Sequence, residues 1–177
     1  VFGFRSLNKF KIERKVETLT EKIEENIVGL SELVSVKYNY TNIVEYDNSL
    51  NISGISIPFT NKTFLVKYSG YIKAGSDLSK AELDLVSPKH VKLKIEEPRI
   101  LENVIPEEEV YFFNEKESVF NSLKFDDLYN ILKERKIKVE KEVIDNGILE
   151  DSRQNIESGV VSFMQSLGFE KIDIDFY

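Results

Sequence analysis

The chain has 177 residues, of which 41% are hydrophobic and 31% charged, a balance that suits a folded globular protein and excludes bulk disorder. Cysteine is absent, which excludes disulfides, thiolate metal sites and a thiol nucleophile. The net charge of −7 argues against a nucleic-acid-binding protein, because phosphate contacts need clustered Lys and Arg.

The charge is uneven along the chain. Residues 1–15 hold five basic residues and one acidic residue, a net charge of +4, which leaves −11 for the remainder. We therefore assign residues 1–17 to a basic arm or juxtamembrane segment and residues 18–177 to a single α+β domain. A solvated helix end explains the same charges equally well. The chain opens Val1-Phe2-Gly3-Phe4 without an initiator Met, and we expect a membrane anchor or signal to have preceded it.

The first half of the chain predicts one helix followed by two long strands. Apolar residues recur every three or four positions on one face from Ile12 to Leu30, which is typical of an amphipathic helix. From residue 34 to 46 the apolar period changes to two and indicates a strand. We expect a loop over residues 47–62. A second strand follows, and its predicted buried face carries Phe64, Val66, Tyr68, Gly70 and Ile72.

The second half predicts three shorter strands, a long helix and a last strand. Residues 81–85 and 91–95 form an antiparallel pair across a tight turn, and residues 110–113 give a fifth strand. The helical pattern runs from residue 125 to 167, and Asn146-Gly147 breaks or kinks it. Gly168 stands where a C-terminal glycine cap belongs, before a strand over residues 172–176. The predicted fold is therefore α+β: an antiparallel sheet of five to six strands, an N-terminal helix and a long, kinked C-terminal helix.

The polar face of the second strand is the candidate binding surface. Its side chains project together from one side of the sheet, where two ammonium groups and a phenol could bind an acidic ligand or an acidic partner protein. Polar alternation is equally what the solvent side of any antiparallel strand shows. With the aspartate of the turn that follows, the candidate face comprises Lys67, Ser69, Tyr71, Lys73 and Asp77.

The sequence motifs of familiar enzyme sites are missing. His90, the one histidine, falls in a predicted turn and is expected to be exposed, and we predict no catalytic residue, no metal site and no cofactor. Neither phosphate-binding glycine motif occurs. Acidic clusters such as Glu107–Glu109 read as a solvated surface, although paired carboxylates for glycoside hydrolysis meet only in three dimensions and stay an alternative.

Several segments, taken together and in order, carry a resemblance to a known family. They are Glu32–Thr41, Glu45–Asp47, Lys67–Gly70 and Lys73–Lys80, followed by the long C-terminal helix. In this pattern the chain resembles a family of uncharacterised bacterial proteins, the domain of unknown function 4230, over roughly residues 20–177. The resemblance implies an N-terminal membrane anchor with the domain outside the cytoplasm, and it implies no established activity. A basic stretch directly after a spanning helix favours the cytoplasmic side instead.

These observations lead to one expected function and two alternatives. We expect a binding or interaction module, tethered to the cell membrane by a segment missing from this chain and held outside the cytoplasm. Its expected partners are the membrane and an unknown protein or acidic ligand, with no nucleic acid. The alternatives are a carboxylate-dependent hydrolase acting on a cell-surface polymer and a structural module that self-associates through the long helix or a sheet edge.

Overall fold

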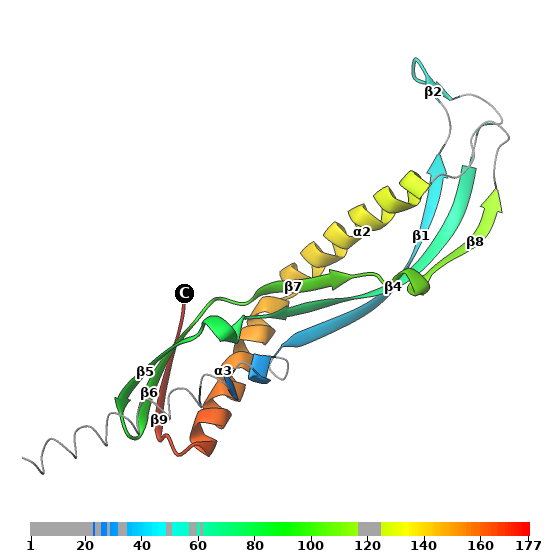
Figure 1. Cartoon of the computed structure of the whole chain (residues 1–177). Coiled ribbons are helices and arrows are strands. Elements are labelled where there is room, and N and C mark those ends of the chain that lie inside the picture. Colours follow the sequence, from blue (N-terminus) through cyan, green and yellow to red (C-terminus); the bar gives the residue numbers. More distant parts are fainter. Residues whose placement is uncertain are drawn as a thin grey trace, which may run out of the picture. The chain divides into compact units, whose positions relative to one another are not determined.

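The computed structural model describes residues 23, 26–27, 29–31, 35–48, 51–56, 60, 62–116 and 125–177. The described residues between 23 and 31 are helical. The other elements, shown in Figure 1, are β1 (Val36–Asn48), β2 (Asn51–Ile52), β3 (Ile55–Ser56), β4 (Lys62–Gly75), the 3-10 turn η1 (Leu78–Lys80), β5 (Glu82–Ser87), β6 (His90–Ile95), β7 (Arg99–Val104), the 3-10 turn η2 (Glu107–Glu109), β8 (Val110–Lys116), α2 (Phe125–Asp145), α3 (Ile148–Ser166) and β9 (Lys171–Phe176). The predicted α+β class, with a helix before the strands and a long interrupted helix near the end, is confirmed.

The described residues pack into two compact units. Unit 1 comprises the described residues of the ranges Val1–Val36, Ala74–Arg99 and Leu149–Tyr177, and unit 2 comprises those of Lys37–Lys73 and Ile100–Ile148. The assignment of residues 18–177 to a single domain stays a prediction. The predicted basic arm, residues 1–17, lies outside the described residues.

Unit 2 is a sheet built around β4, with α2 covering one of its faces. Strand β4 pairs with β1, β7 and β8, and the β8 pair is antiparallel. The predicted inward face of β4 is confirmed, because the side chains of Phe64, Val66, Tyr68 and Ile72 are all at most 2% exposed. Buried residues of α2 supply the apolar layer over this face: Ile131, Val139 and Val143.

Two side-chain contacts fix the direction of β1 against β4. The hydroxyls of Thr41 and Ser69 lie 2.9 Å apart, and the ring centroids of Tyr46 and Phe64 lie 4.9 Å apart. The residue number therefore increases along β1 in the direction in which it decreases along β4, so the two strands are antiparallel. Odd-numbered residues of both strands point to the sheet face opposite α2, which we call the open face.

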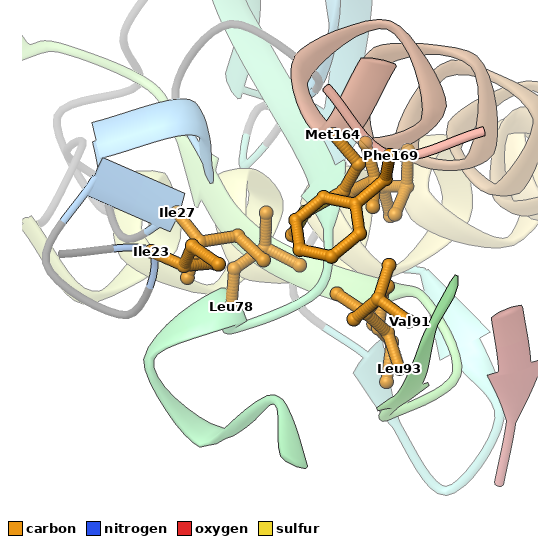
Figure 2. Close-up of a cluster of buried hydrophobic side chains, with 10 residues drawn as sticks. Ile23, Ile27, Leu78, Val91, Leu93, Met164 and Phe169 are labelled. Carbon is orange, nitrogen blue, oxygen red and sulfur yellow. The ribbon is translucent and has the colours of Figure 1, made fainter. Parts of the chain in front are cut away.

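Unit 1 is a three-stranded sheet packed against α3. Strands β5 and β6 form the predicted antiparallel pair, while β9 lies parallel to β6. The parallel pair corrects the expectation of an all-antiparallel sheet, because strand direction depends on where the long connection through the helices returns the chain. Figure 2 shows the core, to which the described part of the first helix adds Ile23 and Ile27 beside the buried residues Leu78, Val91, Leu93, Met164 and Phe169.

Two glycines end the long helices as predicted. Gly147 follows α2 with φ at +94°, a conformation that costs a residue with a Cβ atom more than it costs glycine. Gly168 follows α3 with the same φ. The N–H of Phe169 bonds the carbonyl of Met164 at 3.2 Å, and the N–H of Gly168 bonds that of Gln165 at 2.9 Å. Together these bonds make the glycine cap expected at a helix C-terminus.

Two elements differ from the predictions. The segment predicted as a loop contains the hairpin β2–β3, in which Ile52 pairs with Ile55. Strand β7 was not predicted, because Pro98 and Pro106 break the sequence on both sides of it. Its pairing partner is β4, which lies far away in the sequence and which no local pattern reveals.

Candidate functional site

The candidate face lies mainly on the open face of unit 2. Lys67, Ser69, Tyr71 and Lys73 occupy alternate positions of β4, opposite the buried residues that meet α2. All four are partly exposed. The sequence therefore placed these side chains correctly on one face, and their role in binding stays a prediction.

A hollow of about 350 Å³ opens on this side of the sheet, and we call it the open-face hollow. Strands β1 and β4 form its floor, and the η2 turn before β8 forms one wall. It is lined by Asn39, Tyr40, Thr41, Ser69, Gly70, Tyr71, Pro106 and Glu109. The lining thus offers an amide, several hydroxyls, one carboxylate and an aromatic ring.

Cross-strand contacts hold the polar lining in place. The hydroxyl of Thr41 on β1 bonds that of Ser69 on β4 at 2.9 Å. Tyr71 donates its phenol proton to Oε2 of Glu102 on β7 at 3.0 Å, and this bond raises the pKa of the phenol above its usual value. The ammonium group of Lys37 lies 3.9 Å from the centroid of the Tyr71 ring. The ring is therefore fixed by neighbours on both adjoining strands.

The predicted lysines flank the hollow rather than line it. Neither Lys67 nor Lys73 is among the lining residues. The ammonium group of Lys67 lies 5.9 Å from the ring centroid of Tyr111, its cross-strand neighbour on β8. The charged side chain among the residues that line the hollow is Glu109, while the ammonium group of Lys37 lies against the Tyr71 ring.

Asp77, the remaining candidate, has a local structural role in unit 1. Its Oδ1 accepts the backbone N–H of Ser79 at 3.2 Å and the hydroxyl of Ser79 at 2.5 Å, and so caps η1. These two bonds lower the pKa of the Asp77 carboxyl. An aspartate that caps a helical turn is satisfied without any ligand.

Below the floor of the hollow, the ring of Tyr40 packs closely over Gly70. A Cβ atom on Gly70 would lie 2.6 Å from the Tyr40 hydroxyl and 2.6 Å from the carbonyl oxygen of Val104. The Tyr40 hydroxyl is buried and has no hydrogen-bond partner among the described residues. Burial raises the pKa of this phenol to about 12.

The histidine prediction was wrong in its placement. His90 is the first residue of β6, its side chain is 17% exposed, and its Nε2 lies 2.7 Å from Oδ2 of Asp173 on β9. This bond lowers the pKa of the Asp173 carboxyl. The sequence around His90 could not predict this contact, because the parallel β6–β9 pair brings together residues 83 positions apart.

Two further hollows lie beside α2 in unit 2, with volumes of about 400 Å³ and 230 Å³. The larger is lined in part by Asn103 and Glu140, and the smaller by Arg135 and Glu142. Each of the three hollows thus carries a single carboxylate. No group of three or more His, Asp or Glu side chains within the described ranges is placed to hold a metal ion. Among these residues, no helix has the length and apolar character needed to cross a membrane.

Some lining residues could not be singled out from the sequence. Asn39 and Thr41 fall on the polar side of their predicted strand, where nothing distinguishes them from ordinary solvent-facing residues. Glu109 belongs to a run that the sequence predicts to be a solvated acidic surface, and Pro106 indicates a break between elements. The pairing of β8 with β4 brings the η2 turn to the hollow, and this is a tertiary contact.

Comparison with known proteins places the chain in a family. The model of a family described as Protein of unknown function (DUF4230) matches residues 25–174. The chain belongs to this family. The match runs from before β1 into β9 of the DUF4230 chain, so unit 2, most of the described part of unit 1, the open-face hollow and the His90–Asp173 pair lie within it. No curated protein and no solved structure matches the chain.

Proposed function

We propose that this DUF4230 protein is a membrane-tethered, extracytoplasmic binding module, and that the open-face hollow binds a sugar unit of a cell-surface polymer. One observation carries the choice of site. Four polar side chains from two strands, Asn39, Thr41, Ser69 and Tyr71, converge on one hollow of about 350 Å³ on the sheet face opposite α2. That volume lies within the range of small-ligand sites.

The chemistry of the lining supports an uncharged, hydroxyl-rich ligand. Amides and hydroxyls both donate to and accept from sugar hydroxyls, and a carboxylate accepts from them. The face of an aromatic ring packs against the C–H groups of a sugar. The predicted acidic ligand has less support, because Lys67 and Lys73 do not line the hollow while Glu109 does. A like-charged carboxylate beside an anionic ligand lowers its affinity.

The membrane tether and the extracytoplasmic location rest on other grounds. Residues 1–15 carry a net charge of +4, which suits a segment beside anionic lipid, and the family resemblance implies an N-terminal anchor. Fractionation of cells that make the full-length protein, with protease added to intact cells, tests both points. We expect membrane-bound protein that external protease removes, and a protected or freely cytosolic protein would contradict the location.

The hydrolase alternative needs two carboxyl groups converging in one cleft. In each of the three hollows, one carboxylate lines the wall: Glu109, Glu140 or Glu142. Binding is therefore the better supported function of the open-face hollow. Release of reducing sugar from cell-surface polymer, with loss of that activity in Glu109→Gln, would instead favour the hydrolase.

Binding to an array of neutral and anionic oligosaccharides, followed by calorimetry on the best ligand, tests the site. Tyr71→Ala should weaken binding by about fivefold or more, because a stacked ring contributes roughly 1 kcal/mol or more. Tyr71→Phe keeps the ring and should lose only a few-fold. Ser69→Ala should weaken binding through the lost hydroxyl, whereas Lys92→Ala, an exposed residue of β6 in unit 1, is the control.

Two outcomes would contradict the proposed site. Equal affinities of wild type and Tyr71→Ala would place the ligand elsewhere. Selective binding of anionic oligosaccharides, lost in Lys67→Ala and Lys73→Ala but kept in Tyr71→Ala, would restore the acidic ligand and move the site to the flanking lysines.

A further inference from the structure

Strand β1 presents an unusually long edge that is unpaired among the described residues, with side chains of α2 beside its middle at Asn42–Val44. Among the described residues it pairs with β4 on one side only, and it runs for 13 residues. The other edge strands β5, β7, β8 and β9 have six or seven residues each. Proteins keep edge strands short, or protect them with charges and bulges, because open backbone groups recruit further strands. A long edge of this kind is therefore suited to pairing.

When the β1 strands of two copies are aligned antiparallel with Asn42 opposite Asn42, their side chains are complementary. In that register Lys37 faces Asp47 of a second copy, and Tyr38 faces Tyr46. The register leaves no residue of the 13-residue strand unpaired. Lys37 and Asp47 are both exposed, and the Lys37 ammonium, which lies 3.9 Å from the centroid of the Tyr71 ring, would turn to the carboxylate across such an edge.

We propose that two copies of this chain pair antiparallel along β1, with Asn42 at the two-fold axis and the ion pair Lys37–Asp47 at each end. The occupant of the β1 edge is thus a second copy of the chain. Antiparallel pairing of identical strands requires a two-fold axis perpendicular to the sheet, and facing residues must then share odd or even numbering. The register about Asn42 meets this condition.

Charge complementarity selects this register over its neighbours. A shift of the axis to Ile43 places Asn39 opposite Asp47 and leaves Lys37 without a partner. A shift to Thr41 pairs Lys37 with Glu45 but places Val36 opposite Tyr46 and leaves Asp47 and Asn48 beyond the paired strand. Opposite charges and aromatic pairs directly across antiparallel strands are the contacts that fix register.

The pairing has a consequence for the site. An axis perpendicular to the sheet keeps the open faces of both copies on the same side. The two open-face hollows, each lined by Asn39 and Thr41 of β1, would then lie on one continuous sheet and could engage one polymer at two points. The self-association does not depend on the proposed function, because it rests on the strand edge alone.

Charge exchange at the ends of β1 tests the interface by sedimentation over micromolar to millimolar concentrations. Lys37→Glu places like charges at both ends of the pair and should weaken self-association by about tenfold, and Asp47→Lys should do the same. An equimolar mixture of the two variants should associate again as a heterodimer, because every facing pair is then of opposite charge. The double variant should also self-associate.

The mixture makes the test independent of folding defects in either variant. A monomeric wild type over the whole range would overturn the proposal. So would variants that associate as strongly as wild type, or a mixture no stronger than its components. Association broken by Glu45→Lys but not by Asp47→Lys would overturn the register about Asn42.

Oxidative crosslinking tests the axis directly, since the chain has no native cysteine. Asn42→Cys faces its own copy, with Cα atoms at the 4.5–5.5 Å of facing strand residues, and should form a disulfide-linked dimer, about 5 Å being within disulfide reach. Glu45→Cys is the matched control. Its two copies would lie six residues apart along the strands, roughly 20 Å at ~3.3 Å per residue, and should stay uncrosslinked. Crosslinking of the control and not of Asn42→Cys would refute the axis.

Discussion

Gly70 in the middle of β4 is the position where a single methyl group should do most damage to unit 2. In Gly70→Ala the added Cβ atom would lie 2.6 Å from the Tyr40 hydroxyl and 2.6 Å from the Val104 carbonyl oxygen. Ordinary contact begins near 3.4 Å, so each approach is 0.8 Å too short. The carbonyl belongs to β7, which is hydrogen-bonded to β4, and cannot retreat without disturbing the sheet.

The expected cost follows from these contacts. Overpacking in a well-packed core costs about 1–3 kcal/mol, and a clash with backbone falls at the upper end, so Gly70→Ala should lose about 2–3 kcal/mol of unfolding free energy. Tyr40→Phe alone should be nearly neutral, because the hydroxyl it removes has no partner among the described residues. In the double variant the Phe should recover little of the Gly70→Ala loss, because Cζ of the ring, 2.7 Å from the added Cβ, and the Val104 carbonyl oxygen both remain.

Urea unfolding, followed by circular dichroism and by the fluorescence of the eight tyrosines, measures these free energies. Gly147→Ala is the matched control in the same unit, because its added Cβ meets nothing within 4 Å and only its φ of +94° is unfavourable. It should cost about 1 kcal/mol, with no recovery in Tyr40→Phe. A loss below about 0.5 kcal/mol in Gly70→Ala, or full recovery of that loss in the Tyr40→Phe background, would refute the steric argument.

Three further predictions concern pH and a buried hydrogen bond. The pKa of the Tyr40 phenol is raised from 10.0 to about 12, so the folded state should lose stability as pH rises from 10 toward 12, and this loss should be absent from Tyr40→Phe in alkaline urea titrations. The His90 contact lowers the pKa of Asp173, so its contribution is present above the ordinary carboxyl pKa and is lost as pH falls through the lowered value. The stability difference between wild type and Asp173→Asn should therefore shrink in acid, and a pH-independent difference would contradict this. Ser76 is 3% exposed and donates to the carbonyl of Glu96 at 2.7 Å, so Ser76→Ala should cost about 1–2 kcal/mol in thermal unfolding, and an unchanged midpoint would refute it.

For the candidate site, the sequence predicted which side chains share a face of the sheet, but it did not predict the hollow on that face. The alternation of β4 put Ser69 and Tyr71 on the open face, and both line the hollow. The same reasoning included Lys67 and Lys73, because period-two alternation assigns every second residue to one face. It does not show which of these residues lies beside another structural element and lines a hollow. Asp77 was included with the same face and instead caps η1.

The sequence by itself determined what depends on local chemistry. The period of apolar residues fixed the inward face of β4, and the conformational freedom of glycine fixed the ends of the helices at Gly147 and Gly168. Only the tertiary structure decided which strands meet. The parallel β6–β9 pair, which brings His90 to Asp173, and the β4–β7 pair, which brings Tyr71 to Glu102, join residues 83 and 31 positions apart. Such contacts are selected by the packing of the whole chain, because local propensity carries no information about distant partners.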